Sequence, residues 1–239
     1  MTAVFEPESK TIQIMFDSLA NRYDIFNRLT SLGLDNSWRQ KALESIRPGM
    51  RVLDLGCGTG DLSLEAARRL GTSGEVVGID FSEKMLGVAK KRCKALGIPL
   101  NGHFRLLHKS AEELPIETEP YDLVVSGFVL RNIYENIDRI LEGVYASLKT
   151  GGEVSFLDFT EPSGKLRLSL WKFYMNTVAA FYGWILFGKR FPREYMTRSA
   201  ERFLKAPEFI KKLEDAGFTD VTVKRSLMGI IVLYQARKP

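Results

Sequence analysis

The spacing of the hydrophobic residues changes repeatedly along this chain of 239 residues. Short apolar runs, each of the length of a buried strand, recur at 52–55, 75–80, 103–108, 121–126, 153–159, 219–224 and 229–236. Between and around them, apolar residues three or four positions apart predict helices at 9–29, 37–46, 62–70, 83–96, 136–148 and 206–216. Strands that alternate with helices in this way predict an α/β fold, with a parallel sheet and helices on both of its faces.

Two segments lie outside this alternation. Residues 1–48 precede the first strand, and we expect their helices to cover the carboxyl ends of the strands as a lid. Residues 163–204 follow the fifth strand as a helical insert that is rich in aromatic and basic residues. Residues 1–239 are therefore expected to form a single domain, made of the sheet, the lid and the insert.

The composition of the insert bears on its environment. Lys172 and Asn176 interrupt its apolar run, which is too short and too polar to span a bilayer. Aromatic rings beside basic residues favour a helix that lies at an anionic membrane surface or lines a pocket for an apolar substrate. An ordinary helical cap with one buried face is the alternative.

The first predicted strand ends in a glycine-rich loop. Three glycines at alternate positions, Gly56, Gly58 and Gly60, follow the strand, and a helix pattern comes next. A strand, a glycine turn and a helix in this order are the opening unit of a nucleotide-binding sheet. Glycines let the backbone turn sharply and let a ligand lie against it, because no Cβ is in the way.

The spacing and the charge of this loop favour a particular ligand. Its G-x-G-x-G pattern differs from the G-x-G-x-x-G of dinucleotide sites, and Asp54 and Asp61 flank it. Two carboxylates would repel a pyrophosphate, but they suit a ligand that carries an ammonium group and no phosphate. S-adenosylmethionine is such a ligand, and D-x-G-x-G-x-G resembles motif I of the class I methyltransferases. The alternative is a glycine-rich turn with solvated acidic residues.

Further residues join this loop at the carboxyl edge of the predicted sheet. Asp80 ends the second strand, where it is placed to bind the ribose hydroxyls of S-adenosylmethionine. Phe81 and Met85 come next and are expected either to cover the adenine or to pack in the core. The loops after the later strands bring to the same crevice Ser110, Gly127–Asn132 and Asp158.

Several stretches beyond motif I add a more specific pattern. They are Tyr23–Gly33 with Trp38-Arg39, Leu130–Ile133, Leu157–Pro162, Tyr195-Met196 with Ser199, and Ala216–Phe218. Together with motif I they cover essentially the whole chain, which resembles the ubiquinone/menaquinone biosynthesis C-methyltransferases (the UbiE/MenG family).

This resemblance implies a class I methyltransferase fold, a Rossmann-like sheet of seven strands that is mostly parallel and has an antiparallel last strand. It also implies methyl transfer from S-adenosylmethionine, which leaves as S-adenosylhomocysteine, to a ring carbon of a prenylated quinol in respiratory quinone biosynthesis. The quinol is of the demethylmenaquinol or 2-polyprenyl-6-methoxybenzoquinol type. The cofactor contacts expected from the loop, the strand ends and the resemblance are Asp54, Gly56, Gly58, Thr59, Gly60, Asp80, Phe81, Met85, Ser110, Ala111 and Gly127.

Some positions depart from the family pattern. A serine that usually follows the fourth strand is Gly127 here, with Ser126 beside it. On the side expected to face the substrate, other residue types give way to Asp35, Arg193, Leu227 and Tyr234. These departures favour, as the alternative, a methyltransferase that uses the same donor on another lipid or phenolic small molecule, for example in phospholipid N-methylation.

The expected reaction requires a residue that activates the quinol. A ring carbon of a quinol is a poor nucleophile until the neighbouring hydroxyl loses its proton. We expect Arg131 to stabilise the phenolate, and we expect Tyr23, Asn132 or Asp158 to orient or deprotonate the hydroxyl. A salt bridge at the end of a strand is the alternative role for Arg131.

The net charge and the cysteines bear on whether the protein binds nucleic acid or a metal ion. The net charge of +5 would allow a nucleic-acid partner, but Ser126–Val129 lacks the Asn/Asp-Pro-Pro-Tyr motif common in amino-methylating nucleic-acid enzymes. Cys57 and Cys93 have no metal-ligand spacing, and isolated thiols suit a reducing compartment. His103 and His108 are expected to be structural.

These observations together predict a lipophilic small-molecule substrate, no nucleic acid and no metal. They place the protein in the cytoplasm, in peripheral contact with the inner face of the membrane, and they allow a homodimer. A module that binds the cofactor without catalysis is a further alternative.

Overall fold

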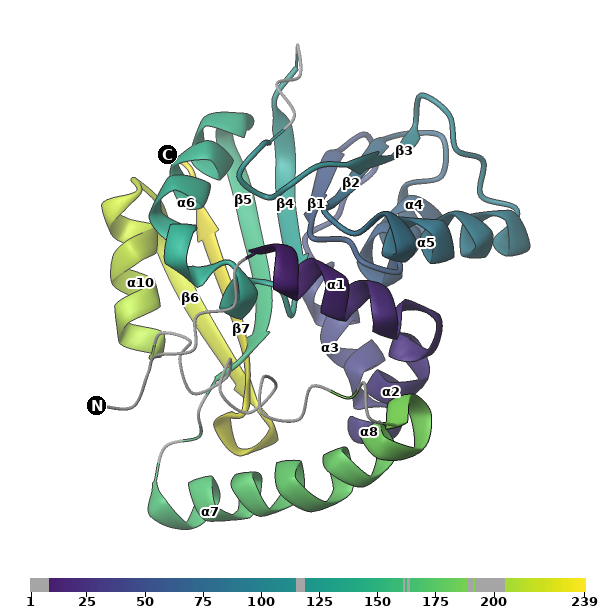
Figure 1. Ribbon diagram of the computed structural model, residues 1–239. Coiled ribbons are helices and arrows are strands. Elements are labelled where there is room, and N and C mark those ends of the chain that lie inside the picture. Colours follow the sequence, from purple (N-terminus) through teal and green to yellow (C-terminus); the bar gives the residue numbers. More distant parts are fainter. Residues whose placement is uncertain (1–8, 115–118, 161, 163, 189–190, 192–204) are drawn as a thin grey trace.

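The computed structural model describes all residues except 1–8, 115–118, 161, 163, 189–190 and 192–204. Its centre is a seven-stranded sheet in the order β3-β2-β1-β4-β5-β7-β6 (Figure 1). The strands are β1 (Arg51–Leu55), β2 (Glu75–Asp80), β3 (Phe104–His108), β4 (Tyr121–Gly127), β5 (Leu148–Phe159), β6 (Thr219–Ser226) and β7 (Ile231–Arg237). The first five pair in parallel, and β7 pairs antiparallel with both β5 and β6. The predicted class of sheet, with an antiparallel last strand, is confirmed.

Helices cover both faces of the sheet. The α-helices are α1 (Ser9–Leu19), α2 (Tyr23–Thr30), α3 (Leu34–Ala42), α4 (Asp61–Leu70), α5 (Glu83–Leu96), α6 (Ile137–Ser147), α7 (Lys165–Tyr174), α8 (Ala180–Phe187) and α10 (Ala206–Asp215). Short turns of helix are η1 (Ala20–Arg22), η2 (Leu130–Asn132), η3 (Tyr134–Asn136), η4 (Met175–Ala179) and η6 (Leu227–Gly229). Side chains of α6 and α10 pack on one face, and side chains of α3, α4 and α7 pack on the other. Strands buried on both faces explain why the sequence shows continuous apolar runs.

The structure differs from the predicted elements at three places. The helix expected over 9–29 is interrupted by the 3₁₀ turn η1, so that α1 and α2 are separate. The next helix covers Leu34–Ala42 rather than 37–46, because Gly33, with a φ of +78°, reverses the chain just before Leu34. Strand β5 begins at Leu148, five residues before the predicted start, because Leu148 already pairs with Tyr121 of β4 across an irregularity in register.

The N-terminal helices lie at the carboxyl end of the sheet, and α1 passes across the ends of β1 and β4 (Figure 1). The insert contributes α7, the π-helical turn η4 and α8, which follow one another as a long outer helix. This outer helix holds α2: the rings of Phe26 and Phe187 lie 5.8 Å apart, and the Tyr174 hydroxyl donates to the carbonyl of Thr30 at 2.5 Å. The grouping of residues 1–239 into one domain with a lid and an insert stays a prediction.

No helix in the described ranges is long and apolar enough to cross a membrane. The motif residues Tyr195, Met196 and Ser199, and the departure at Arg193, lie outside the described residues.

Candidate active site

The glycine-rich loop forms one wall of a cavity at the carboxyl ends of the strands. Gly56, Gly58 and Gly60 have φ values of +71°, +54° and +90°, which only glycine adopts without strain. A Cβ on Gly56 would lie 2.6 Å from a methyl group of Val129 in the loop after β4. Gly56 and Gly58 line the cavity. Gly60 does not appear in that lining; it is the residue before α4, where a Cβ would crowd Ala89 at 3.2 Å.

Asp80 is fixed at the end of β2 by two backbone groups. Its carboxylate accepts hydrogen bonds from the N–H groups of Gly58 and Ser82, each at 2.8 Å. Burial raises the pKa of Asp80 to about 6, so the group is mostly ionised at neutral pH. Each carboxylate oxygen has accepted one donor and keeps a lone pair, which fits the expected bond to ribose hydroxyls.

Asp54 is buried beneath the loop with one oxygen unused. The Ser63 hydroxyl donates to Oδ2 of Asp54 at 2.5 Å, whereas Oδ1 has no hydrogen-bond partner in the described part of the chain. Burial raises the pKa of Asp54 to about 7, and the nearby charge of Asp80 adds to the rise. A buried acceptor without a donor is costly, and a cationic ligand group would satisfy it.

In the other flanking acid, Asp61, each carboxylate oxygen lies beside an arginine side chain. Its oxygens lie 3.2 Å from Nε of Arg39 and 2.7 Å from Nη2 of Arg92. Burial would raise the pKa of Asp61, but these two guanidinium groups lower it below its usual value. Both flanking acids therefore line the cavity, but arginine side chains already pair with Asp61, whereas Oδ1 of Asp54 has no donor in the described chain.

The side of the cavity where the adenine is expected is lined by residues that follow β2 and β3. Phe81, Met85, Ser110 and Ala111 all line the cavity. The lid closes on this region, since the ring of Phe16 in α1 lies 6.3 Å from the ring of Phe81, edge to face. The loop after β4 contributes Gly127 to the lining, whereas the hydroxyl of Ser126 is buried and donates to the carbonyl of Leu55 at 2.7 Å.

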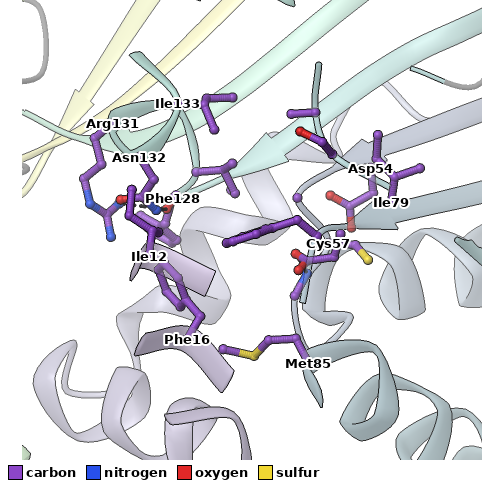
Figure 2. Close-up of a pocket in the computed structure, with 18 of the residues that line it drawn as sticks. Ile12, Phe16, Asp54, Cys57, Ile79, Met85, Phe128, Arg131, Asn132 and Ile133 are labelled. Atoms are coloured by element: carbon purple, nitrogen blue, oxygen red, sulfur yellow. Dashed lines mark hydrogen bonds between the residues drawn. The ribbon is translucent and has the colours of Figure 1, made fainter. Parts of the chain in front are cut away.

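Arg131 lies at the opposite side of the cavity from Asp54 (Figure 2). Its guanidinium Nη1 donates to Oδ1 of Asp158 at 2.7 Å and to the carbonyl of Phe128 at 2.9 Å. Asp158 has no exposed surface and is absent from the cavity lining; it also accepts from the backbone N–H groups of Arg131 and Phe159. Burial raises the pKa of Asp158 although Arg131 opposes the rise. The pair therefore presents a cation to the cavity and keeps its carboxylate behind that cation.

Tyr23 and Asn132, the other predicted substrate residues, both line the cavity. Tyr23 begins α2, with its ring 5.9 Å from Phe16. Asp24, the next residue, accepts from the Thr59 hydroxyl at 2.5 Å and from Arg92 Nη1 at 3.0 Å. Thr59 thus reaches both the cavity and the lid, so the lid is tied directly to the glycine-rich loop.

Phe128 belongs to the Gly127–Asn132 stretch that was expected at the crevice, and it lines the cavity. Its φ of +65° is strained for a bulky residue, and its ring lies 4.6 Å from that of Phe159. Sequence reasoning did not single out three other lining residues, Arg39, Ile12 and Phe16. The guanidinium group of Arg39 lies over the ring of Phe128, with its central carbon 4.9 Å from the ring centre. Of these three residues, Arg39 alone belonged to a stretch that resembles the family pattern, Trp38-Arg39.

Residues expected to mark a change of substrate lie elsewhere. Asp35 is buried against Arg28 and Ser31, Tyr234 is buried in the sheet, and Leu227 is exposed. None of the three lines the cavity. This corrects the expectation that these departures face the substrate.

The remaining candidate side chains are accounted for by packing. His103 and His108 each bond a backbone carbonyl, and burial raises the pKa of the Cys57 thiol. No cluster of metal-ligand residues occurs in the part of the chain that the structure describes.

The cavity fits S-adenosylmethionine. The unused oxygen of Asp54 suits an ammonium group, Asp80 suits the ribose, and the glycines leave space beside the loop. Phe81 and Met85 are apolar members of the lining next to Asp80, where the base is expected, and Met85, at 2% exposure, also packs in the core.

The sequence and the fold are similar to those of known methyltransferases. The sequence model of the ubiE/COQ5 methyltransferase family matches residues 4–238. A demethylmenaquinone methyltransferase of Bacillus cytotoxicus is 31% identical over 98% of both chains. A ubiquinone/menaquinone biosynthesis C-methyltransferase of Geobacter sulfurreducens is 34% identical, over 97% of this chain and 90% of the relative. A methyltransferase structure from Thermotoga maritima, dependent on S-adenosylmethionine, has a TM-score of 0.66 at 17% identity, over 95% of this chain and all of that chain.

Proposed function

Because this chain belongs to the ubiE/COQ5 methyltransferase family and is an enzyme that uses S-adenosylmethionine, we propose that it methylates a ring carbon of a prenylated quinol. The quinol is of the demethylmenaquinol or 2-polyprenyl-6-methoxybenzoquinol type. The observation that carries this proposal is the buried Arg131–Asp158 pair, which presents a cation to a cavity with apolar walls.

A cation at this position answers the chemical requirement of a quinol. When bound, S-adenosylmethionine supplies a methyl group as a sulfonium and leaves as a neutral thioether. The quinol hydroxyl must lose its proton for the ring carbon to react, and the Arg131 guanidinium stabilises the phenolate in a site with little water. Asp158 acts as a positioning residue, since it holds Arg131 from behind through three hydrogen bonds to Arg131 and Phe159.

Tyr23 and Asn132 are proposed to orient the hydroxyl. Both line the cavity, and Asn132 is next to Arg131 in η2. The ring of the substrate then lies among Ile12, Phe16 and Phe128, which exclude water from the reacting atoms. The hydroxyl proton passes to solvent before transfer, and the methylated ring is then a dienone whose methyl-bearing carbon still carries its hydrogen. Loss of that hydrogen as a proton to water, and return of a proton to the oxygen, restore the aromatic quinol, so that one proton is released in each turnover.

The direct test is methyl transfer from labelled S-adenosylmethionine to reduced demethylmenaquinol, with a reduced demethoxy-type benzoquinol and phosphatidylethanolamine in parallel. We expect carbon methylation of at least one quinol and none of the phospholipid, as read by mass spectrometry of the product. Turnover of the phospholipid, or of neither quinol while the donor still binds, would overturn the proposal.

We also propose that the outer helix lies on an anionic membrane surface. Leu166, Leu170 and Phe173 of α7 recur at three- and four-residue steps and are more than half exposed, as are Phe181 and Trp184 of α8. Exposed Lys165 and Arg167 flank this apolar face, which suits anionic headgroups. The same contact supports the proposed location at the inner face of the membrane. A homodimer stays a prediction.

Introducing charge into this face should release the protein from vesicles. Phe173 and Trp184 are each 67% exposed, and their replacement together by glutamate is expected to weaken binding to vesicles with anionic lipid by at least about tenfold. Leu96→Glu is the matched control, because Leu96 of α5 is 63% exposed but lies outside the outer helix. Equal losses in the two variants, measured by sedimentation, would count against this surface.

A further inference from the structure

Arg39 lies in the lining of the cavity with an incompletely satisfied guanidinium. The residue belongs to α3, is buried and lines the cavity. Its Nε lies 3.2 Å from Asp61, which leaves the two terminal nitrogens for other acceptors. Nη1 is buried and makes no hydrogen bond to the described residues, although it lies 3.7 Å from a carboxylate oxygen of Asp35.

A complementary group lies close to it. Oδ1 of Asp54 is a buried acceptor without a donor in the described chain, and Asp54 lines the same cavity. Arg39 and Asp54 line the same cavity, and burial raises the pKa of Asp54 while the charge of Arg39 opposes that rise. Other buried atoms of this kind, such as those of Ser155 and Tyr234, belong to the sheet and do not line the cavity.

The pair matches the two charges of an amino acid. The amino-acid portion of S-adenosylmethionine carries one ammonium and one carboxylate, and Asp54 suits only the former. We propose that Arg39 binds the carboxylate of this portion with its terminal nitrogens, in the forked geometry that guanidinium and carboxylate groups favour. The inference rests on the methyl donor and is independent of which acceptor is methylated.

The other nearby arginines are engaged differently. Arg92 bonds Asp24, Asp61 and the carbonyl of Thr59, and it does not line the cavity. Arg131 is held by Asp158 on the side away from Asp54 (Figure 2). Arg39 also connects the lid to the end of the loop, because it joins α3 to Asp61 at the start of α4.

The test compares two ligands that differ only in the carboxylate: S-adenosylhomocysteine and its decarboxylated analogue. Calorimetry on the unmodified protein should show that removing the carboxylate weakens binding by about 10- to 100-fold. In Arg39→Met, removing the carboxylate from the ligand should weaken binding by less than about threefold, because the carboxylate has lost its partner in the protein. Lysine keeps the positive charge but cannot form two parallel hydrogen bonds, so in Arg39→Lys the loss of affinity on removing the carboxylate should lie between these two values.

Arg92→Met is the matched control, since it removes the other arginine bound to Asp61. A residue that merely supports the loop alters the affinities for both ligands together, so Arg92→Met should retain the full preference for the carboxylate. Equal binding of the two ligands by the unmodified protein would overturn the inference without any variant having to fold. An undiminished preference in Arg39→Met would overturn it as well. Neither measurement uses a quinol, so failure here is distinct from failure of the proposed substrate.

Discussion

Arg131→Ala is expected to reduce kcat for methyl transfer by about 100- to 1,000-fold, because the phenolate loses the cation that stabilises it. Binding of S-adenosylhomocysteine should change by less than about threefold, since Arg131 lies across the cavity from Asp54 and the glycine-rich loop (Figure 2). Single-turnover rates with a quinol, together with calorimetry, separate these two effects. Unchanged turnover would exclude this role for Arg131.

The variant also removes half of a buried ion pair. Asp158 has no exposed surface, so its carboxylate would be left without a counter-charge, at a cost of about 3–5 kcal/mol in the free energy of unfolding. The double variant Arg131→Ala/Asp158→Asn controls for this loss, because it removes both charges. We expect it to recover most of the stability and none of the activity. Recovery of activity with stability would show that the pair is structural.

The glycine-rich loop and Asp80 could be predicted because their roles depend on local order along the chain. Alternate glycines after a strand dictate a sharp turn wherever the strand lies, and an acid at the end of the next parallel strand must reach the same edge. Ser110 follows from the same rule, whereas Ala111 was expected from the family resemblance. All of these residues except Gly60 line the observed cavity.

The direction of a side chain beyond a strand end could not be predicted in this way. Asp158 is the second-last residue of β5, much as Asp80 is the last residue of β2, yet it faces Arg131 and is not part of the cavity lining. Its partner comes from a turn 27 residues earlier, so only the tertiary fold decides the outcome. Arg39 shows the same limit: its motif was visible, but its position between Asp61 and Phe128 depends on how α3 packs.

Asp54→Asn is expected to stabilise the ligand-free protein while it weakens cofactor binding. Burial raises the pKa of Asp54 from the usual 3.8 to about 7, so the folded state binds a proton more tightly than the unfolded chain. The free energy of unfolding therefore falls as the pH rises from about 4 to about 7, and the full penalty is present above pH 7. Asparagine carries no charge and removes this penalty.

The size of the gain depends on pH. At pH 8 we expect Asp54→Asn to unfold with a free energy about 1–3 kcal/mol higher than the unmodified protein, and the difference should shrink as the pH approaches 4. Urea titrations at several pH values measure it. In the same variant, binding of S-adenosylhomocysteine should weaken by about 10- to 100-fold at pH 8, because the ligand ammonium group has lost its carboxylate.

Asp61→Asn is the matched control, and we expect it to change the free energy of unfolding in the opposite direction. Arg39 and Arg92 lower the pKa of Asp61, so its contribution to stability is present above the pKa of the unfolded chain and is lost as the pH falls through the folded value. Asp61→Asn should therefore destabilise the protein at pH 8 and have less effect in acid. If both variants destabilised the protein at pH 8, Asp54 would be a structural carboxylate. If Asp54→Asn bound the ligand as tightly as the unmodified protein, the ammonium group would have to lie elsewhere.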